Sequence, residues 1–167
     1  KAYNSLDPNN TTKTIVKNKY VCALDYCRPS SYILSTDVAI NRVKVLDGNN
    51  ELINNFTTSG VTDYTDYSAS NVANLTYGKS YTLEVSRNST VDPANRKAWI
   101  DWNIDGDFDD AGELIMFETS AYTSSNTTTF TVPALANSFE GKTVLRVAAN
   151  YNNETTTPCG PITAGEY

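Results

Sequence analysis

At the centre of the chain lies the stretch Ala98-Trp99-Ile100-Asp101-Trp102-Asn103-Ile104-Asp105-Gly106-Asp107-Phe108-Asp109-Asp110-Ala111-Gly112-Glu113. Six carboxylates fall within its last thirteen residues, and no Lys or Arg occurs from Ala98 to Glu118. Like charges this close repel one another unless a cation or much water lies among them. The stretch therefore predicts a cation-binding loop.

The spacing of the oxygen-bearing side chains favours Ca2+, which takes about six to eight oxygen ligands that one tight loop can supply. Gly106 permits the sharp turn that such a loop needs. The expected ligands are five side chains and one main-chain carbonyl, that of Asp107; the side chains are those of Asp101, Asn103, Asp105, Asp109 and Glu113. This set differs from an EF-hand, because Glu113 stands at loop position 13 and the flanks have strand character. We expect the ion to stabilise the fold and not to take part in catalysis.

Period-two alternation places this loop between two strands. In Lys97–Asn103, Ala98, Ile100 and Trp102 fall on one face, and Trp99, Asp101 and Asn103 fall on the other. Leu114–Phe117 is a short apolar run that is typical of a buried strand returning from the loop. The sequence thus predicts a β-hairpin connection, with Phe108 anchoring it in the core.

The rest of the chain predicts further strands and no helix. Alternation marks strands at Val38–Leu46, Tyr81–Val85, Thr127–Val132 and Leu145–Ala149, with a bulge near Asn41-Arg42, and Val72–Leu75 is a weaker candidate. About seven short strands separated by turn residues are typical of an all-β, antiparallel β-sandwich of the jelly-roll or immunoglobulin-like kind.

Composition excludes several classes of function. The net charge of −6 equals the charge of the six loop carboxylates, so the chain has no basic face for nucleic acid. Histidine is absent, which removes the usual general base and the Ser-His and Cys-His pairs, and we expect no enzyme. No apolar run approaches the ~20 residues that span a bilayer, so we expect no membrane insertion. A chain that begins at Lys1, without Met, is expected to be a mature or trimmed product.

Beyond these patterns, the acidic stretch resembles the hallmark of the GEVED domain, a β-sandwich module of secreted, multidomain bacterial proteins, especially those of Bacteroidetes. Weaker motifs follow the family's order: Tyr26-Cys27, Val61-Thr62-Asp63-Tyr64-Thr65, Gly78-Lys79-Ser80-Tyr81-Thr82-Leu83, Thr143-Val144-Leu145-Arg146-Val147, Pro158-Cys159-Gly160 and Gly165-Glu166. The resemblance covers about Cys27 to Tyr167. It implies an extracellular, non-enzymatic structural or adhesion module, with residues 21–167 as the domain and residues 1–20 as an extended N-terminal arm or linker.

The resemblance also bears on the three cysteines. Cys27–Cys159 is the preferred disulfide, because it would tie the start of the domain to its end. Cys22–Cys159 is an alternative, and so is Cys22–Cys27 with Cys159 free.

The chain departs from the family at its end, where Gly165-Glu166-Tyr167 stands in place of a longer final strand. A sandwich lacking that strand would have an open edge. Residues 1–19 of a neighbouring copy could fill this edge by donor-strand exchange, which would make the protein a filament subunit.

One alternative function is a carbohydrate-binding module appended to a secreted enzyme, which would recognise a surface glycan. Aromatic faces stack on sugars, and a tyrosine-rich set could form such a platform: Tyr64, Tyr67, Tyr77 and Tyr81. Core and cross-strand packing is the more common role of such residues, and we expect it here. A hydrolase using Asp101 and Glu113 is the third and weakest hypothesis, since metal-bound carboxylates are occupied.

Overall fold

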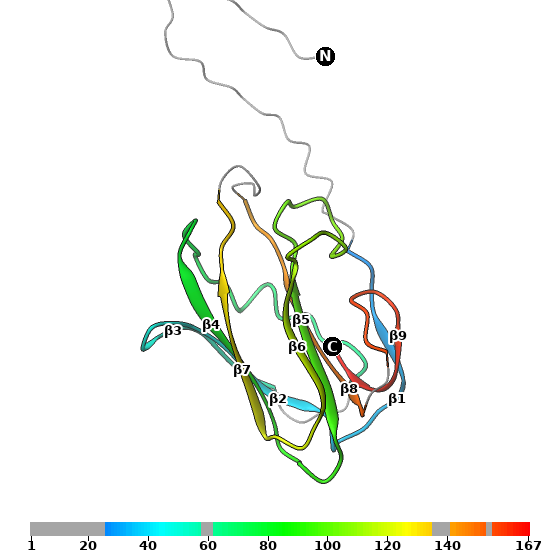
Figure 1. Ribbon diagram of the computed structural model, residues 1–167. Coiled ribbons are helices and arrows are strands. Elements are labelled where there is room, and N and C mark those ends of the chain that lie inside the picture. Colours follow the sequence, from blue (N-terminus) through cyan, green and yellow to red (C-terminus); the bar gives the residue numbers. More distant parts are fainter. Residues whose placement is uncertain (1–25, 58–61, 135–140, 153–154) are drawn as a thin grey trace, which may run out of the picture.

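The computed structural model describes residues 26–57, 62–134, 141–152 and 155–167, which form two β-sheets packed face to face (Figure 1). One sheet has the strand order β1-β9-β8-β5-β6 and the other β3-β2-β4-β7. The strands are β1 Ser30–Ile33, β2 Ile40–Asp47, β3 Asn50–Phe56, β4 Ser80–Arg87, β5 Ala94–Ile100, β6 Leu114–Ala121, β7 Ser125–Thr131, β8 Leu145–Tyr151 and β9 Pro161–Glu166. No helix occurs among the described residues, and none could therefore span a membrane there.

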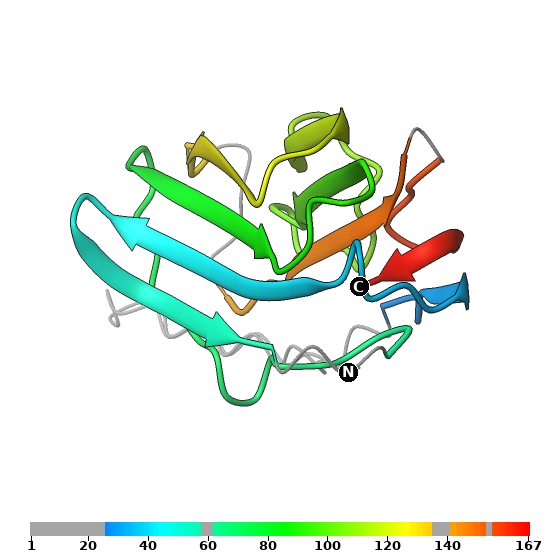
Figure 2. The ribbon, with the colours of Figure 1, turned by 90° about the horizontal axis from the view of Figure 1, so that it is seen from below.

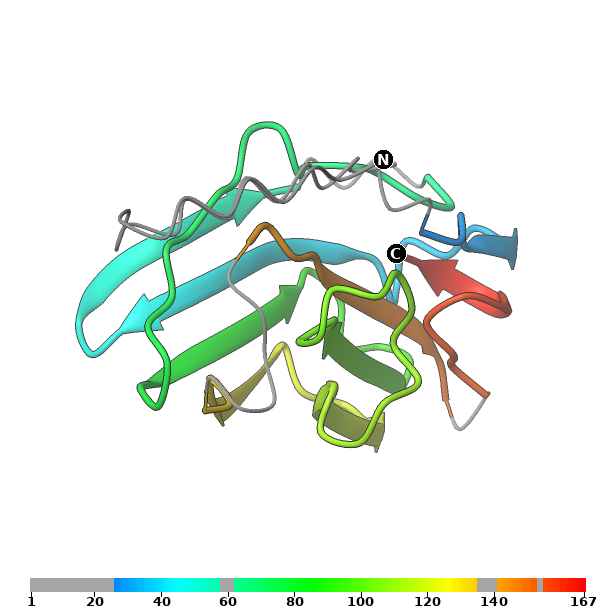
Figure 3. The same cartoon turned by 90° about the horizontal axis from the view of Figure 1, so that it is seen from above.

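The expected all-β class and two-sheet architecture are confirmed, and the views from below and from above show the two layers (Figures 2 and 3). The bulge near Asn41-Arg42 is also confirmed, because the β2–β4 register shifts between Ile40 and Arg42. Val72–Leu75 is not a strand, so that expectation is wrong. The sheets are not wholly antiparallel, since β1 runs parallel to β9. The finer assignment to a jelly-roll or immunoglobulin-like sandwich stays a prediction.

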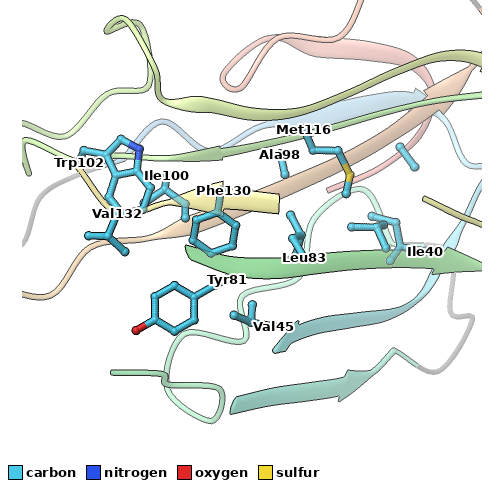
Figure 4. Packing of buried hydrophobic residues seen from close by; sticks show 12 residues of the cluster. Ile40, Val45, Tyr81, Leu83, Ala98, Ile100, Trp102, Met116, Phe130 and Val132 are labelled. Carbon is cyan, nitrogen blue, oxygen red and sulfur yellow. The ribbon is translucent and has the colours of Figure 1, made fainter. Parts of the chain in front are cut away.

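The core lies between the sheets (Figure 4). Ala98, Ile100 and Trp102 point into it from β5 and the residues that follow, as the alternation predicts. Tyr81 is only 3% exposed and its ring stacks on Phe130, with 5.9 Å between centroids. Tyr77 packs against the same cluster. Two members of the tyrosine-rich set are thus packing residues.

The last strand of the described chain is β9, which contains Gly165 and Glu166. β9 pairs with β8 on one side and with β1 on the other. Gly165 makes this pairing possible, because a Cβ at that position would lie 1.9 Å from the carbonyl oxygen of Ala149 on β8. The β9–β8 pairing covers Ala149 and Asn150, and β1 is the edge strand at this end of the sheet. The open edge predicted beyond Glu166 stays a prediction. The arm at residues 1–20 lies outside the described residues, as does Cys22.

A buried carboxyl group links the two sheets. Glu166 on β9 is 7% exposed, and its Oε1 accepts a hydrogen bond of 2.5 Å from the backbone N–H of Ile40 on β2. Burial raises the pKa of Glu166 from 4.5 to about 7, and the hydrogen bond opposes this rise in part.

Candidate metal centre

The acidic residues form the loop between β5 and β6, which pair antiparallel. The predicted hairpin connection is therefore confirmed. The returning strand is not the buried strand that was expected, because β6 is an edge strand with Leu114 and Phe117 exposed. Ile100 donates its backbone N–H to the carbonyl oxygen of Glu113 at 2.9 Å, which closes the base of the loop. The loop lies at one end of the sandwich, at the top of Figure 1 and toward the viewer in Figure 3.

Asp101 organises the loop from within. Its side chain is fully buried and accepts four hydrogen bonds. Oδ1 accepts from the backbone N–H of Ile104 at 2.6 Å and of Asp105 at 3.3 Å. Oδ2 accepts from the backbone N–H of Gly106 at 3.0 Å and from the Tyr26 hydroxyl at 2.7 Å. A buried carboxylate that accepts this many donors is satisfied by hydrogen bonding alone.

Glu113, at the other end of the loop, is also a buried carboxylate that accepts hydrogen bonds from the loop backbone. It is 1% exposed; Oε1 accepts from the Trp102 N–H at 2.9 Å and Oε2 from the Asp110 N–H at 3.3 Å. Burial raises the pKa of Glu113, and the negative charges of Asp101 and Asp110 add to the rise, while the two backbone hydrogen bonds oppose it. Asp101 and Glu113 thus hold the loop backbone from both ends.

Two loop residues have a left-handed backbone. Gly106 has φ 101°, which confirms the turn expected there. Ile104 has φ 57°, a conformation that is unfavourable for a β-branched residue by roughly 1–2 kcal/mol. The backbone N–H of Ile104 donates a hydrogen bond to the Asp101 carboxylate, and Ile104 is only 9% exposed. Burial and the hydrogen bond to Asp101 offset the strain.

Three carboxylates gather at the exposed rim of the loop. One oxygen each of Asp105, Asp107 and Asp110 lies within 4.8 Å of the others. The Asn103 amide donates to Asp105 Oδ2 at 2.7 Å and to Asp110 Oδ2 at 2.5 Å, which holds two of the three together. Among the described residues, no Lys or Arg forms an ion pair with these carboxylates. A hard cation would relieve the repulsion, so the donor set fits Ca2+ chemically.

The rim cluster differs from the ligand set predicted from spacing. Asp105 belongs to both sets. Asp107 belongs to both as well, although its carboxylate, and not the predicted carbonyl, lies in the cluster. Asp110 is a rim residue that the spacing argument missed, and Asp109 is not a member of the cluster. Asp101 and Glu113 hold the backbone beneath, so the predicted set remains a prediction.

Phe108 anchors the loop, as expected, but on the outer face of the five-stranded sheet and not between the sheets. It is 3% exposed and packs with Trp99 and Ala148. The Tyr26 ring stacks on it with 5.4 Å between centroids, and the guanidinium carbon of Arg146 lies 4.8 Å from the Phe108 centroid. Sequence reasoning singled out neither Tyr26 nor Arg146 for this site, because their partners are distant in the chain.

The preferred disulfide, Cys27–Cys159, is confirmed, with 5.4 Å between the Cα atoms. It closes a separation of 132 residues and joins the segment before β1 to the segment before β9. The acidic loop, the two ends of the domain and the disulfide therefore share one region of the molecule.

Residues 95–167 match the GEVED domain. This confirms the resemblance over that range, which contains the whole acidic loop, Arg146, Cys159 and Glu166. Tyr26 and Cys27 contact this range from outside it, so the GEVED match includes only one half of the disulfide. No curated protein and no solved structure matches the chain.

Proposed function

We propose that the protein is a non-enzymatic, extracellular structural or adhesion module whose fold is stabilised by Ca2+. The observation that carries this proposal is the rim of the acidic loop, where Asp105, Asp107 and Asp110 converge without an ion-pair partner among the described residues. The loop backbone beneath them is held by two buried carboxylates, Asp101 and Glu113, which accept hydrogen bonds from backbone N–H groups of the loop.

The ion's role would be electrostatic. Ca2+ would neutralise the repulsion between carboxylates and would bind the folded loop more tightly than the unfolded chain. At a free concentration of 100 times Kd, such binding adds roughly 2.7 kcal/mol to the free energy of unfolding. The disulfide supports the extracellular assignment, because disulfides persist in oxidising compartments.

The first test is thermal unfolding of the full chain with Ca2+ and with a chelator. Chelation is expected to lower the melting temperature by about 5–10 °C, since roughly 2.7 kcal/mol is lost and each kcal/mol corresponds to about 2–4 °C in a chain of this size. Restored Ca2+ should reverse the change. Identical melting curves in Ca2+ and chelator would contradict the proposal.

A matched pair of variants tests which carboxylates bind the ion. Asp109→Asn and Asp110→Asn remove the same charge from adjacent, exposed positions. If the rim cluster binds Ca2+, Asp110→Asn should raise the Kd measured by calorimetry at least tenfold, and Asp109→Asn should change it about threefold or less. The opposite order would favour the ligand set predicted from spacing.

Self-association through residues 1–19 is the second part of the proposal. β1 supports it, because β1 is the edge of its sheet and carries exposed apolar side chains, with Tyr32 at 78% and Ile33 at 58% exposure. Light scattering of the full chain should show a concentration-dependent oligomer that a chain lacking residues 1–19 does not form. A monomer at all concentrations would contradict donor-strand exchange.

A further inference from the structure

Two residues outside the acidic loop connect it to the disulfide. Tyr26 directly precedes Cys27, and its hydroxyl donates to Asp101 Oδ2 at 2.7 Å. Asp101 is the fully buried carboxylate that holds the first turn of the loop. The Tyr26 ring also covers Phe108, the apolar anchor of the loop. One side chain therefore contacts both the polar and the apolar support of the loop.

Arg146 on β8 completes the connection from the other side. It is 5% exposed, and its guanidinium lies over the Phe108 ring. Nη2 donates to the carbonyl oxygen of Cys27 at 2.9 Å, and Nη1 donates to the carbonyl oxygen of Pro158 at 2.7 Å. These two carbonyls belong to the two chain segments that the disulfide joins. Arg146 thus fixes both segments against the anchor of the loop.

We propose that Tyr26 and Arg146 are positioning residues that make the cation affinity of the acidic loop depend on the Cys27–Cys159 disulfide. The inference rests on the proposed function, because it concerns the same ion. Neither residue has to touch the ion: Tyr26 orients Asp101, and Arg146 holds Phe108 and the backbone of Cys27. Outer residues of this kind typically change metal affinity about 10–100-fold when they are removed.

The physical basis is the conformational entropy lost when the segment before β1, which contains Tyr26, becomes ordered. With the disulfide closed, the Tyr26 hydroxyl is already placed against Asp101, so ion binding does not have to order that segment. With the disulfide absent, the segment before β1 gains conformational freedom, and part of the binding free energy goes into ordering it again. The loop's own sequence is unchanged, yet its affinity falls.

The decisive variant is Tyr26→Phe, which keeps the ring on Phe108 and removes only the hydroxyl. Tyr81→Phe is the matched control, because it also removes one hydroxyl that makes a hydrogen bond. The Tyr81 hydroxyl lies in the core between the sheets and accepts from the backbone N–H of Thr76 at 2.9 Å. Calorimetric titration of each full-length variant with Ca2+ should give a Kd about tenfold higher for Tyr26→Phe. Tyr81→Phe should stay within about twofold of the unaltered chain.

A spectroscopic measurement separates positioning from general stability. Tb3+ can replace Ca2+ in oxygen-ligand sites, and Trp99 and Trp102 flank the start of the loop and can sensitise its emission. Tyr26→Phe should shift the Tb3+ titration midpoint about tenfold, and Tyr81→Phe should not. Equal midpoints for the unaltered chain and Tyr26→Phe would overturn the inference.

The dependence on the disulfide is tested by a double-mutant cycle. In a Cys27→Ser/Cys159→Ser chain, Tyr26→Phe should have less than a twofold further effect on Kd, since the hydroxyl is no longer held. An undiminished tenfold effect of Tyr26→Phe in that chain would overturn the dependence on the disulfide.

Arg146→Lys is a second variant, in which the disulfide stays closed. Lysine keeps the positive charge but lacks the planar guanidinium that donates to two carbonyl oxygens at once, so the Kd for Ca2+ should also rise. If the disulfide-free chain does not fold, Arg146→Lys carries the test alone, and an unchanged Kd overturns the inference.

Failure of the proposed function would be recognisable separately. If the unaltered chain binds neither Ca2+ nor Tb3+, the calcium proposal fails, and hydrogen exchange of the metal-free chain then tests the connection itself. Faster exchange of residues 101–113 in Tyr26→Phe, but not in Tyr81→Phe, would support the positioning role. Equal exchange in both variants would overturn it.

Discussion

Among single residues, three buried carboxyl groups accept hydrogen bonds from backbone N–H groups. Asp101 and Glu113 do this within the acidic loop, and Glu166 does it between the sheets. Glu166 differs from the other two because it accepts only one hydrogen bond from the described residues, which leaves its ionised form poorly stabilised.

The Glu166 carboxyl should make the fold less stable as the pH rises. Its pKa is raised from 4.5 to about 7 on folding, so the folded chain binds the proton more tightly. The stabilisation is complete below pH 4.5 and is lost as the pH rises through about 7. Glu166→Gln keeps an oxygen acceptor for the Ile40 N–H and removes the titration. The unfolding free energy of the variant minus that of the unaltered chain should therefore increase by on the order of 2–3 kcal/mol from pH 4.5 to pH 8.

Urea unfolding of both chains at a series of pH values measures this difference. Glu84→Gln is a suitable control, because Glu84 lies at the surface of the other sheet, where it pairs with Lys44 at 3.8 Å. A difference between Glu166→Gln and the unaltered chain that does not vary with pH would contradict the assigned pKa.

At the scale of elements, β9 is the strand that depends most on a single residue. The strand joins β8 to β1, and the close approach of β8 leaves no room for a side chain at Gly165. The contact is with backbone atoms of Ala149, which cannot rotate away. The geometry of β8 therefore requires glycine at this position.

Gly165→Ala should destabilise the chain by about 3 kcal/mol or more, because its Cβ would overlap the Ala149 carbonyl at 1.9 Å and force the strands apart. Gly78→Ala is the matched control: Gly78 has φ 72° but nothing within 4 Å of the new Cβ, so only backbone strain of about 1 kcal/mol is expected. Denaturant unfolding compares the two, and equal losses would show that no collision occurs at Gly165.

At the scale of the whole molecule, the disulfide and the acidic loop form one support on the outer face of the five-stranded sheet. The cluster of Trp99, Phe108 and Ala148 lies there, with Tyr26 and Tyr167 packed against it. The Tyr167 hydroxyl lies 2.6 Å from the carbonyl oxygen of Thr157 and 2.9 Å from that of Gly160, and its one proton is shared between them. Burial raises the pKa of Tyr167 to about 12. The two ends of the described domain are thus closed against each other.

Removing the Cys27–Cys159 disulfide should lower the free energy of unfolding more than a substitution at the surface does. Cys27→Ser/Cys159→Ser opens a loop of 132 residues, and the chain-entropy model gives a loss of about 4–5 kcal/mol. A melting temperature lower by about 10 °C or more is expected from calorimetry. Cys22→Ser is the control and should change stability by about 0.5 kcal/mol or less. A comparable loss from Cys22→Ser would favour the alternative pairing of Cys22 with Cys159.

The strands whose apolar side chains alternate could be predicted from local sequence. Ala98, Ile100 and Trp102 face the core because period two separates them from Trp99 and Asp101, and this holds wherever one face of a strand is buried. The same periodicity identified the acidic stretch as a hairpin loop, and its charge density indicated a cation. These features depend on neighbours within a few residues, which the sequence lists directly.

The strands without such a pattern could not be predicted, because they depend on contacts that exist only in the folded chain. β1 and β3 are edge strands with exposed, polar or irregular sequences, and β9 contains Pro161 and Gly165, so none of the three shows an alternating apolar face. Pairing with a neighbouring strand, and not local propensity, makes them strands. Tyr26 and Arg146 were hidden for the same reason: they reach the acidic loop from 75 and about 40 residues away in the chain, and such distances are closed only by the folded sheet and its disulfide.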